Sequence, residues 1–259
     1  MSRIQSIFST TKQPVLNIYF TAGYPILDCT LTVMDLLANA GVDIIEIGMP
    51  YSDPLADGPV IQESSSVAIA NGMTIELLFS QLKACRAQPS LSKTGIVLMG
   101  YMNPVLQYGF SRFCADAANA GVDGLILPDL PEYEFEKEYG AIIKENGLDF
   151  IFLVTPETSE ERVRKLDSLS TGFLYAVSSS ATTGGETSFN QVTTYLQRLQ
   201  SYKLKNPVMV GFGIKDKASF DSVVANSQGA IIGSAFIKAL SNKASLHDLI
   251  PSFVKSVRP

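Results

Sequence analysis

Residues 38–48 read ANAGVDIIEIG and residues 118–128 read ANAGVDGLILP, so the same hexapeptide runs twice into an apolar stretch. In both copies the glycine stands just past a predicted helix end, where a left-handed residue is wanted, and the aspartate opens the predicted strand. The two copies lie 80 residues apart, which corresponds to two strand–helix units of about 40 residues each. The repeat therefore predicts that helices and strands alternate along the chain.

Short apolar runs, each bounded by Gly, Pro, Asp or Asn, extend this pattern over the whole sequence. Near-continuous apolar strands are typical of a parallel sheet whose outer face is covered by helices. The predicted strands span residues 15–22, 43–48, 95–100, 123–128, 149–154, 172–177, 207–211 and 229–233. Stretches of helical period lie between them, at 29–41, 75–87, 110–121 and 159–169.

Eight strands alternating with helices predict an α/β fold, a (β/α)₈ TIM barrel. No Pro/Ser-rich linker or shift of charge interrupts the series, so residues 1–259 are interpreted as a single domain. The alternative is a doubly wound open sheet, which would need a switch-point crevice and usually has fewer strands.

The composition excludes several kinds of chemistry. The single histidine, His247, rules out His-rich zinc centres, and a Ser-His-Asp triad would depend entirely on it. The three cysteines, Cys29, Cys85 and Cys114, form no C-x-x-C and are interpreted as reduced, buried thiols. No metal site is therefore expected.

The net charge of −5, without a Lys/Arg cluster, disfavours nucleic acid or an anionic membrane surface as a partner. The N-terminus has no apolar h-region, and nowhere do about 18 apolar residues run together. The sequence therefore predicts a soluble, cytoplasmic protein.

Two carboxylates near the second predicted strand are the main catalytic candidates. Glu46 lies inside an apolar run, where an unpaired carboxylate costs several kcal/mol or takes up a proton. Asp57 follows in a loop stiffened by prolines, and two carboxylates in different surroundings can divide acid and base roles. The alternatives are a helix-facing Glu46 in a salt bridge and, for Asp53 in the same loop, a turn- or helix-capping role.

Glycines after the last two predicted strands suggest an anion site. The seventh strand continues into GFGI and the eighth into GSAF, with a helix predicted to begin at Ser234. A phosphate could bind here to backbone N–H groups and to the helix N-terminus, as it often does at loops in this position of a barrel. The candidate residues are Gly211, Gly213, Gly233 and Ser234. The alternative is that these are simple turn glycines.

Residues 178–190, SSSATTGGETSFN, are predicted to form a lid over the barrel mouth, or else a disordered connection. Tyr175 and Tyr101 are polar-tipped aromatics in or beside apolar runs, and Phe212 could stack on a flat ring; core packing is the alternative for all three. No lysine interrupts the apolar runs, which disfavours imine chemistry.

These residues resemble the tryptophan synthase alpha subunit family. The segment DIIEIGMPYSDPLADGPVIQ at 43–62 matches a long and specific signature of that family. Further matches are FTAGYP at 20–25, YMNP at 101–104, GLILPDLP at 124–131, FIFLVTPET at 150–158, TTG at 182–184, GFGI at 211–214 and IIGSAF at 231–236. The family fold is a TIM barrel with an additional N-terminal helix, which corresponds here to about residues 2–9.

The resemblance implies a lyase that cleaves indole-3-glycerol phosphate to indole and glyceraldehyde 3-phosphate by a retro-aldol reaction. By motif, Glu46 matches the family's general acid and base, and Asp57 matches the carboxylate that pairs with the indole N–H. The residues that fall on the family's substrate-binding positions are Tyr175, Thr183, Gly184, Phe212, Gly213, Gly233 and Ser234. Tyr101 and Gly211 are further substrate-binding candidates, from the sequence pattern alone.

The resemblance also implies a partner. Family members bind a beta subunit in an α₂β₂ complex, and pyridoxal phosphate (PLP) belongs to that partner, so no cofactor is expected in this chain. The contact surface would include Asp53, Pro54, Asn103 and Pro104.

In the predicted lid, Ser179 stands where many members have an arginine, which leaves the anchoring of the lid open. A catalytically weak regulatory partner of a beta subunit is therefore the alternative function. A related phosphate-binding barrel isomerase or synthase fits the Glu46 and Asp57 signature poorly.

Overall fold

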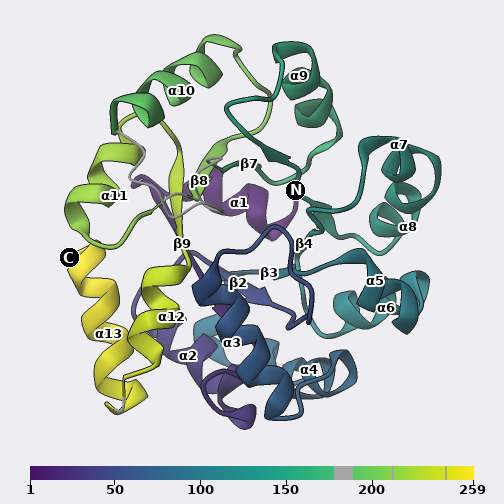
Figure 1. The fold of residues 1–259 in the computed structure, drawn as a ribbon, viewed down its shortest axis with the longest axis vertical. Helices are drawn as coiled ribbons and strands as arrows, with labels where there is room; N and C mark the ends of the chain where they lie inside the picture. Colours follow the sequence, from purple (N-terminus) through teal and green to yellow (C-terminus); the bar gives the residue numbers. More distant parts are fainter. Residues whose placement is uncertain (178–188, 212, 243) are drawn as a thin grey trace.

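Parallel strands form the centre of the molecule and helices surround them (Figure 1). The structure is a computed structural model that describes residues 1–177, 189–211, 213–242 and 244–259. The strands are β1 Val15–Thr21, β2 Ile44–Gly48, β3 Gly95–Met99, β4 Gly124–Ile126, β5 Asp149–Phe150, β6 Leu153–Val154, β7 Leu174–Val177, β8 Val208–Gly211 and β9 Gly229–Ile232. Each predicted strand segment therefore contains an observed strand.

The sheet closes into a barrel through residues 149–154. Its hydrogen-bonded order is β5-β4-β3-β2-β1-β9-β8-β7-β6, so the two ends of the order are consecutive in the chain. Between them, the Ile151 amide donates to the Leu125 carbonyl at 3.0 Å, and Phe152 accepts from the Tyr175 amide at 3.0 Å. β5 and β6 are thus two halves of the fifth predicted strand, bonded to β4 and to β7. The predicted (β/α)₈ barrel is confirmed, and the open doubly wound sheet is wrong.

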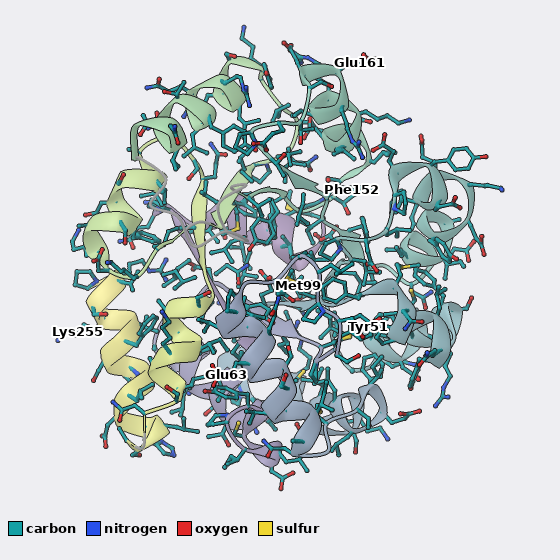
Figure 2. All side chains as sticks on the ribbon, viewed as in Figure 1. Tyr51, Glu63, Met99, Phe152, Glu161 and Lys255 are labelled. Atoms are coloured by element: carbon teal, nitrogen blue, oxygen red, sulfur yellow. The ribbon has the colours of Figure 1, made fainter. Side chains whose placement is uncertain are left out.

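Helices surround the sheet, and all of them except α1 belong to the outer ring. They are α1 Arg3–Thr10, α2 Thr30–Asn39, α3 Pro59–Ala70, α4 Ile75–Leu82, α5 Met102–Tyr108, α6 Phe110–Asn119, α7 Glu132–Glu134, α8 Gly140–Glu145, α9 Glu160–Leu169, α10 Phe189–Ser201, α11 Lys217–Val224, α12 Ser234–Leu240 and α13 Leu246–Val257. In Figure 2, Glu161 on α9 and Lys255 on α13 lie at the rim, whereas Met99 at the end of β3 lies near the middle of the view. Within the described residues, no helix is long and apolar enough to cross a membrane.

Helix α1 covers the amino-terminal end of the barrel, apart from the outer ring. Ile4 and Ile7 pack in one cluster with inward-facing strand residues, which are Val15, Ile44, Val97, Ile126, Ile151, Phe173, Met209 and Ile231. Glycines provide the space, because a Cβ on Gly95 would lie 3.2 Å from Ile7 and one on Gly124 would lie 3.1 Å from Ile4. The additional N-terminal helix, predicted at about residues 2–9, is therefore confirmed.

The repeated hexapeptide forms the same joint twice. Gly41 has φ +90° and Gly121 has φ +85°, so both end their helices in the left-handed region that favours glycine. The Asp43 carboxylate then accepts a hydrogen bond from Leu16 N at 2.9 Å, and Asp123 accepts one from Ile96 N at 2.8 Å. Each aspartate therefore ties the strand that it opens to the preceding strand of the barrel.

Candidate active site

Glu46 lies on the inner face of the barrel. Side chains alternate along a strand, and Ile44, two residues earlier, belongs to the cluster that fills the interior. The Glu46 side chain is fully buried, and its Oε2 accepts a hydrogen bond from Asn17 Nδ2 at 2.8 Å. The helix-facing, salt-bridged alternative is therefore wrong for this residue.

Burial changes the proton affinity of Glu46. It raises the pKa from 4.5 to about 8; the hydrogen bond from Asn17 opposes the rise, and the negative charge of Asp57 adds to it. The Glu46 carboxyl group therefore holds its proton at neutral pH.

Asp57 approaches from the loop after β2 and has a different environment. Its Oδ2 accepts a hydrogen bond from the Tyr101 hydroxyl at 2.9 Å, and that hydroxyl accepts one from Ala56 N at 3.0 Å. Burial raises the pKa of Asp57 to about 6, and the bond from Tyr101 opposes the rise. Asp57 is therefore ionised at neutral pH while Glu46 is protonated, which is the division of roles that acid–base catalysis by two carboxylates requires.

Two tyrosines face these carboxylates from other strands. Tyr19 on β1 stands in register with Glu46, and Tyr175 lies on β7. Burial raises the pKa of each phenol, and the charges of Glu46 and Asp57 raise it further. Both hydroxyls therefore stay protonated and can donate hydrogen bonds within the barrel mouth.

Two glycines make room for these phenols. A Cβ on Gly48 would lie 2.1 Å from the Tyr19 hydroxyl, and a Cβ on Gly211 would lie 2.4 Å from the Tyr175 hydroxyl. Real Cβ atoms do not approach other atoms so closely, so a side chain at either position would displace a tyrosine. The Tyr175 ring therefore explains why a glycine stands at position 211, besides the predicted approach of its backbone to a phosphate.

The remaining candidates for the phosphate site lie after two adjacent strands. β8 pairs with β9 in parallel, with Gly211 opposite Ile231, so the loops that follow them emerge side by side. Helix α12 begins at Ser234, as predicted, with Gly233 as its N-cap residue. Gly213 has φ +50°, and a Cβ there would meet nothing within 4 Å. The backbone is thus open at Gly213, while the phosphate role itself stays a prediction.

The predicted contact residues for a partner lie on two connected loops. Asp53 and Asn103 are exposed, Pro104 is half-buried, and Pro54 is buried. Asn103 Nδ2 donates to the Tyr51 hydroxyl at 3.2 Å, and the Tyr51 and Tyr101 rings lie 5.4 Å apart. Figure 2 shows Tyr51 beside the barrel mouth. The loops after β2 and β3 thus form one surface next to Asp57. Pro54 belongs to the loop after β2 but is buried, so its side chain is not exposed on that surface.

Several predicted residues lie outside the described part of the chain. They are Thr183, Gly184 and Phe212, together with Ser179 and most of the predicted lid at 178–190. The roles expected for them stay predictions.

His247 and the three cysteines lie on elements other than those that carry Glu46 and Asp57. His247 is exposed on α13, and all three cysteines are buried, where burial raises the pKa of each thiol. Among the described residues, no three His, Cys, Asp or Glu side chains gather into a group that could hold a metal ion.

Sequence reasoning missed two residues on β1, Asn17 and Tyr19. The signal was present, because the strand VLNIYFT carries its polar Asn and Tyr two residues apart, as one face of a strand requires. Tyr19 stands opposite Glu46 on the neighbouring strand, and the Asn17 side chain bonds to Glu46 from two residues earlier. Only the register of β1 against β2 reveals these two relations.

The closed barrel and its two carboxylates of different proton affinity define the class of the protein: a (β/α)₈ barrel with a pair of carboxylates that acid–base chemistry could use. A family model described as tryptophan synthase alpha chain matches residues 8–252. The chain belongs to that family, and the resemblance seen in the sequence is confirmed.

Individual relatives agree with the family model. The chain is 49% identical to the tryptophan synthase alpha chain of Flavobacterium johnsoniae and 46% identical to that of Parabacteroides distasonis, with complete coverage of both chains in each comparison. Among solved structures, the tryptophan synthase subunit alpha of Legionella pneumophila has a TM-score of 0.91 at 32% identity, covering 100% of this chain and 97% of the other. The aminoacrylate-bound tryptophan synthase of M. tuberculosis has a TM-score of 0.85 at 32% identity, with both chains fully covered.

Proposed function

We propose that this chain cleaves indole-3-glycerol phosphate to indole and glyceraldehyde 3-phosphate, the alpha reaction of tryptophan biosynthesis. The observation that carries the proposal is the pair Glu46 and Asp57, of which one holds a proton and the other a negative charge at neutral pH. Family membership supports the same reaction.

In the proposed mechanism, Glu46 acts as the general acid. It transfers its proton to C3 of the indole ring, and the ring nitrogen takes up the positive charge. The ionised Asp57 pairs with the indole N–H and stabilises that charge, held in place by the Tyr101 hydroxyl. Protonation at C3 thus converts the ring into an electron sink.

The bond between C3 and the glycerol side chain then breaks. Its electron pair returns to the ring, while the Glu46 carboxylate takes the proton of the adjacent glycerol hydroxyl as the aldehyde forms. Glu46 therefore ends protonated, as it began, and the proton balance closes over one turnover.

We further propose that the phosphate binds to backbone N–H groups at Gly211, Gly213 and Gly233, and at Ser234. The argument is the adjacency of the two loops, together with the left-handed backbone at Gly213. Tyr175 and Tyr101 would contact the substrate beside the carboxylates, with Thr183, Gly184 and Phe212 completing the site.

A tryptophan synthase beta subunit is the proposed partner, in an α₂β₂ complex, and PLP would be bound by that subunit. The contact surface would be the loops after β2 and β3, where Asp53 and Asn103 are exposed and Leu55 is 89% exposed. An exposed leucine in a loop is typical of a protein contact.

We also propose that residues 1–259 form a single domain. We propose that the protein acts in the cytoplasm.

The test is indole release by the purified chain from indole-3-glycerol phosphate, measured with and without a beta subunit. The matched control for Glu46→Gln is Glu63→Gln, because Glu63 is an exposed carboxylate on α3 (Figure 2). We expect release by the wild-type chain and by the control, and none by Glu46→Gln. Stimulation of the beta subunit without any indole release would favour the alternative function, a regulatory partner. That alternative is based on Ser179, which lies outside the described residues.

A further inference from the structure

Asn17 is a buried polar residue in the interior of the barrel. It lies on β1, is fully buried, and donates from Nδ2 to Glu46 Oε2 at 2.8 Å. β1 and β2 are adjacent parallel strands, and Asn17 stands opposite Ile44. Glu46 follows Ile44 by two residues on the same face of β2, so the Asn17 carboxamide reaches it diagonally. The bond thus connects the inner faces of two neighbouring strands.

This pair contains two oxygens without a hydrogen bond. Within the described part of the chain, Asn17 Oδ1 and Glu46 Oε1 are both buried and have no partner. Both are acceptors while Glu46 is ionised, and burying an unpaired acceptor is costly. A proton on Glu46 turns its carboxyl into a donor, which removes one of the two unpaired acceptors.

A carboxamide suits both protonation states of its neighbour. Its N–H group donates to a carboxylate, and its carbonyl oxygen can accept from a carboxylic acid. An aliphatic side chain can do neither, and a carboxylate would repel the charged form of Glu46. Asparagine is therefore a side chain that can hold Glu46 through a cycle in which the proton leaves and returns.

The other groups that face Glu46 do not take this role. Asp57 approaches from the loop after β2, Tyr19 projects from β1 and Tyr175 from β7. Asp57 is an anion that opposes ionisation of Glu46, and no hydrogen bond joins Glu46 to either phenol in the described structure. Asn17 is the group that favours the charged form, against burial and Asp57.

We propose that Asn17 is the positioning residue of Glu46: it holds Oε2 and leaves Oε1 to exchange a proton with the substrate. The proposal rests on the proposed lyase function. Asn17 itself touches no reacting atom and acts through Glu46.

The test replaces Asn17 by leucine, which has similar volume and no hydrogen-bonding group. Loss of a hydrogen bond to the charged form is expected to raise the pKa of Glu46 by about one to two pH units. The alkaline limb of the pH profile of kcat/KM for indole release then moves up by the same amount, while the acid limb stays in place. We expect kcat to fall at least about tenfold with KM nearly unchanged, because the Asn17 side chain bonds to Glu46 and not to the backbone N–H groups proposed to bind the phosphate.

Infrared titration of the Glu46 carboxyl, assigned by difference from Glu46→Gln, measures the same shift without turnover. This separates the two proposals, because the titration can succeed even if the wild-type chain releases no indole. Asn39→Leu on the exposed end of α2 is the matched control and should change neither profile nor titration. If Asn17→Leu does not fold, Asn17→Asp keeps the shape of the side chain, and it should raise the pKa of Glu46 further.

An unmoved alkaline limb and an unmoved carboxyl titration in a folded variant would overturn the proposal. So would equal losses in kcat and in substrate affinity with no change in either pH dependence, because these indicate only a structural role.

Discussion

Replacing Glu46 by glutamine is expected to stabilise the fold at alkaline pH. The side chain is fully buried, and folding raises its pKa from 4.5 to about 8. The unfolded chain therefore releases this proton at a lower pH than the folded chain. The stability that the group contributes is complete below about pH 4.5 and is lost as the pH rises through about 8.

The size of the effect follows from the pKa difference. About 3.5 pH units separate the two pKa values, and each unit corresponds to about 1.36 kcal/mol, so the wild-type chain loses on the order of 5 kcal/mol above pH 8. Glutamine is neutral at every pH and can still accept the hydrogen bond from Asn17. The variant should match the wild-type chain near pH 4.5 and exceed its free energy of unfolding by several kcal/mol at pH 9.

The assay is urea unfolding at pH 5 and pH 9, followed by circular dichroism, for the wild-type chain and for Glu46→Gln. Glu63→Gln, which removes an exposed carboxylate from α3, controls for the change in net charge and should have little effect at either pH. An equal difference in the free energy of unfolding between wild type and Glu46→Gln at both pH values would contradict the assigned pKa shift of Glu46. So would a variant less stable than the wild type at pH 9 with an unchanged m-value.

Three further predictions concern activity. The kcat/KM for indole release should be bell-shaped, rising through about pH 6 as Asp57 ionises and falling through about pH 8 as Glu46 loses its proton; a flat profile from pH 5 to 9 would contradict both roles. Tyr101→Phe removes the hydroxyl that donates to Asp57, so the acid limb should move up by about one pH unit while the alkaline limb stays; an unmoved acid limb would show that this bond is unimportant. Gly213→Val forces a β-branched residue into φ +50°, so KM should rise by about tenfold or more with the circular dichroism spectrum preserved; an unchanged KM would count against the phosphate site.

Much of the barrel could be predicted from the sequence because its signals are local. An apolar run bounded by turn residues forms a strand wherever it is covered, and Gly41 and Gly121 end their helices through their own backbone conformation. The prediction was less accurate at the fifth strand, which β5 and β6 divide between two neighbouring strands. That division follows from hydrogen bonds to β4 on one side and to β7 on the other, which the apolar run itself does not encode.

The candidate site was partly predictable for the same reason. A carboxylate inside a core strand is conspicuous, and Glu46 was identified from the sequence on that ground. Asn17 and Tyr19 were missed, because the role of a polar residue in a strand depends on its neighbours on the adjacent strand, and the sequence does not give the pairing of strands. Pro54, predicted as a contact residue, is buried beneath the loop surface, and the sequence offers no signal for that.

Local sequence patterns specify the order of strands and helices, the carboxylates available for catalysis and, through the motifs, the family. The proton affinities on which the proposed mechanism depends arise only when the chain folds. Burial inside the closed barrel raises the pKa of both carboxylates, and their different hydrogen-bond donors and exposure leave Glu46 protonated and Asp57 charged at neutral pH. A pKa depends on the solvent, charges and hydrogen-bond donors around a group, and residues from distant parts of the chain supply these only after folding.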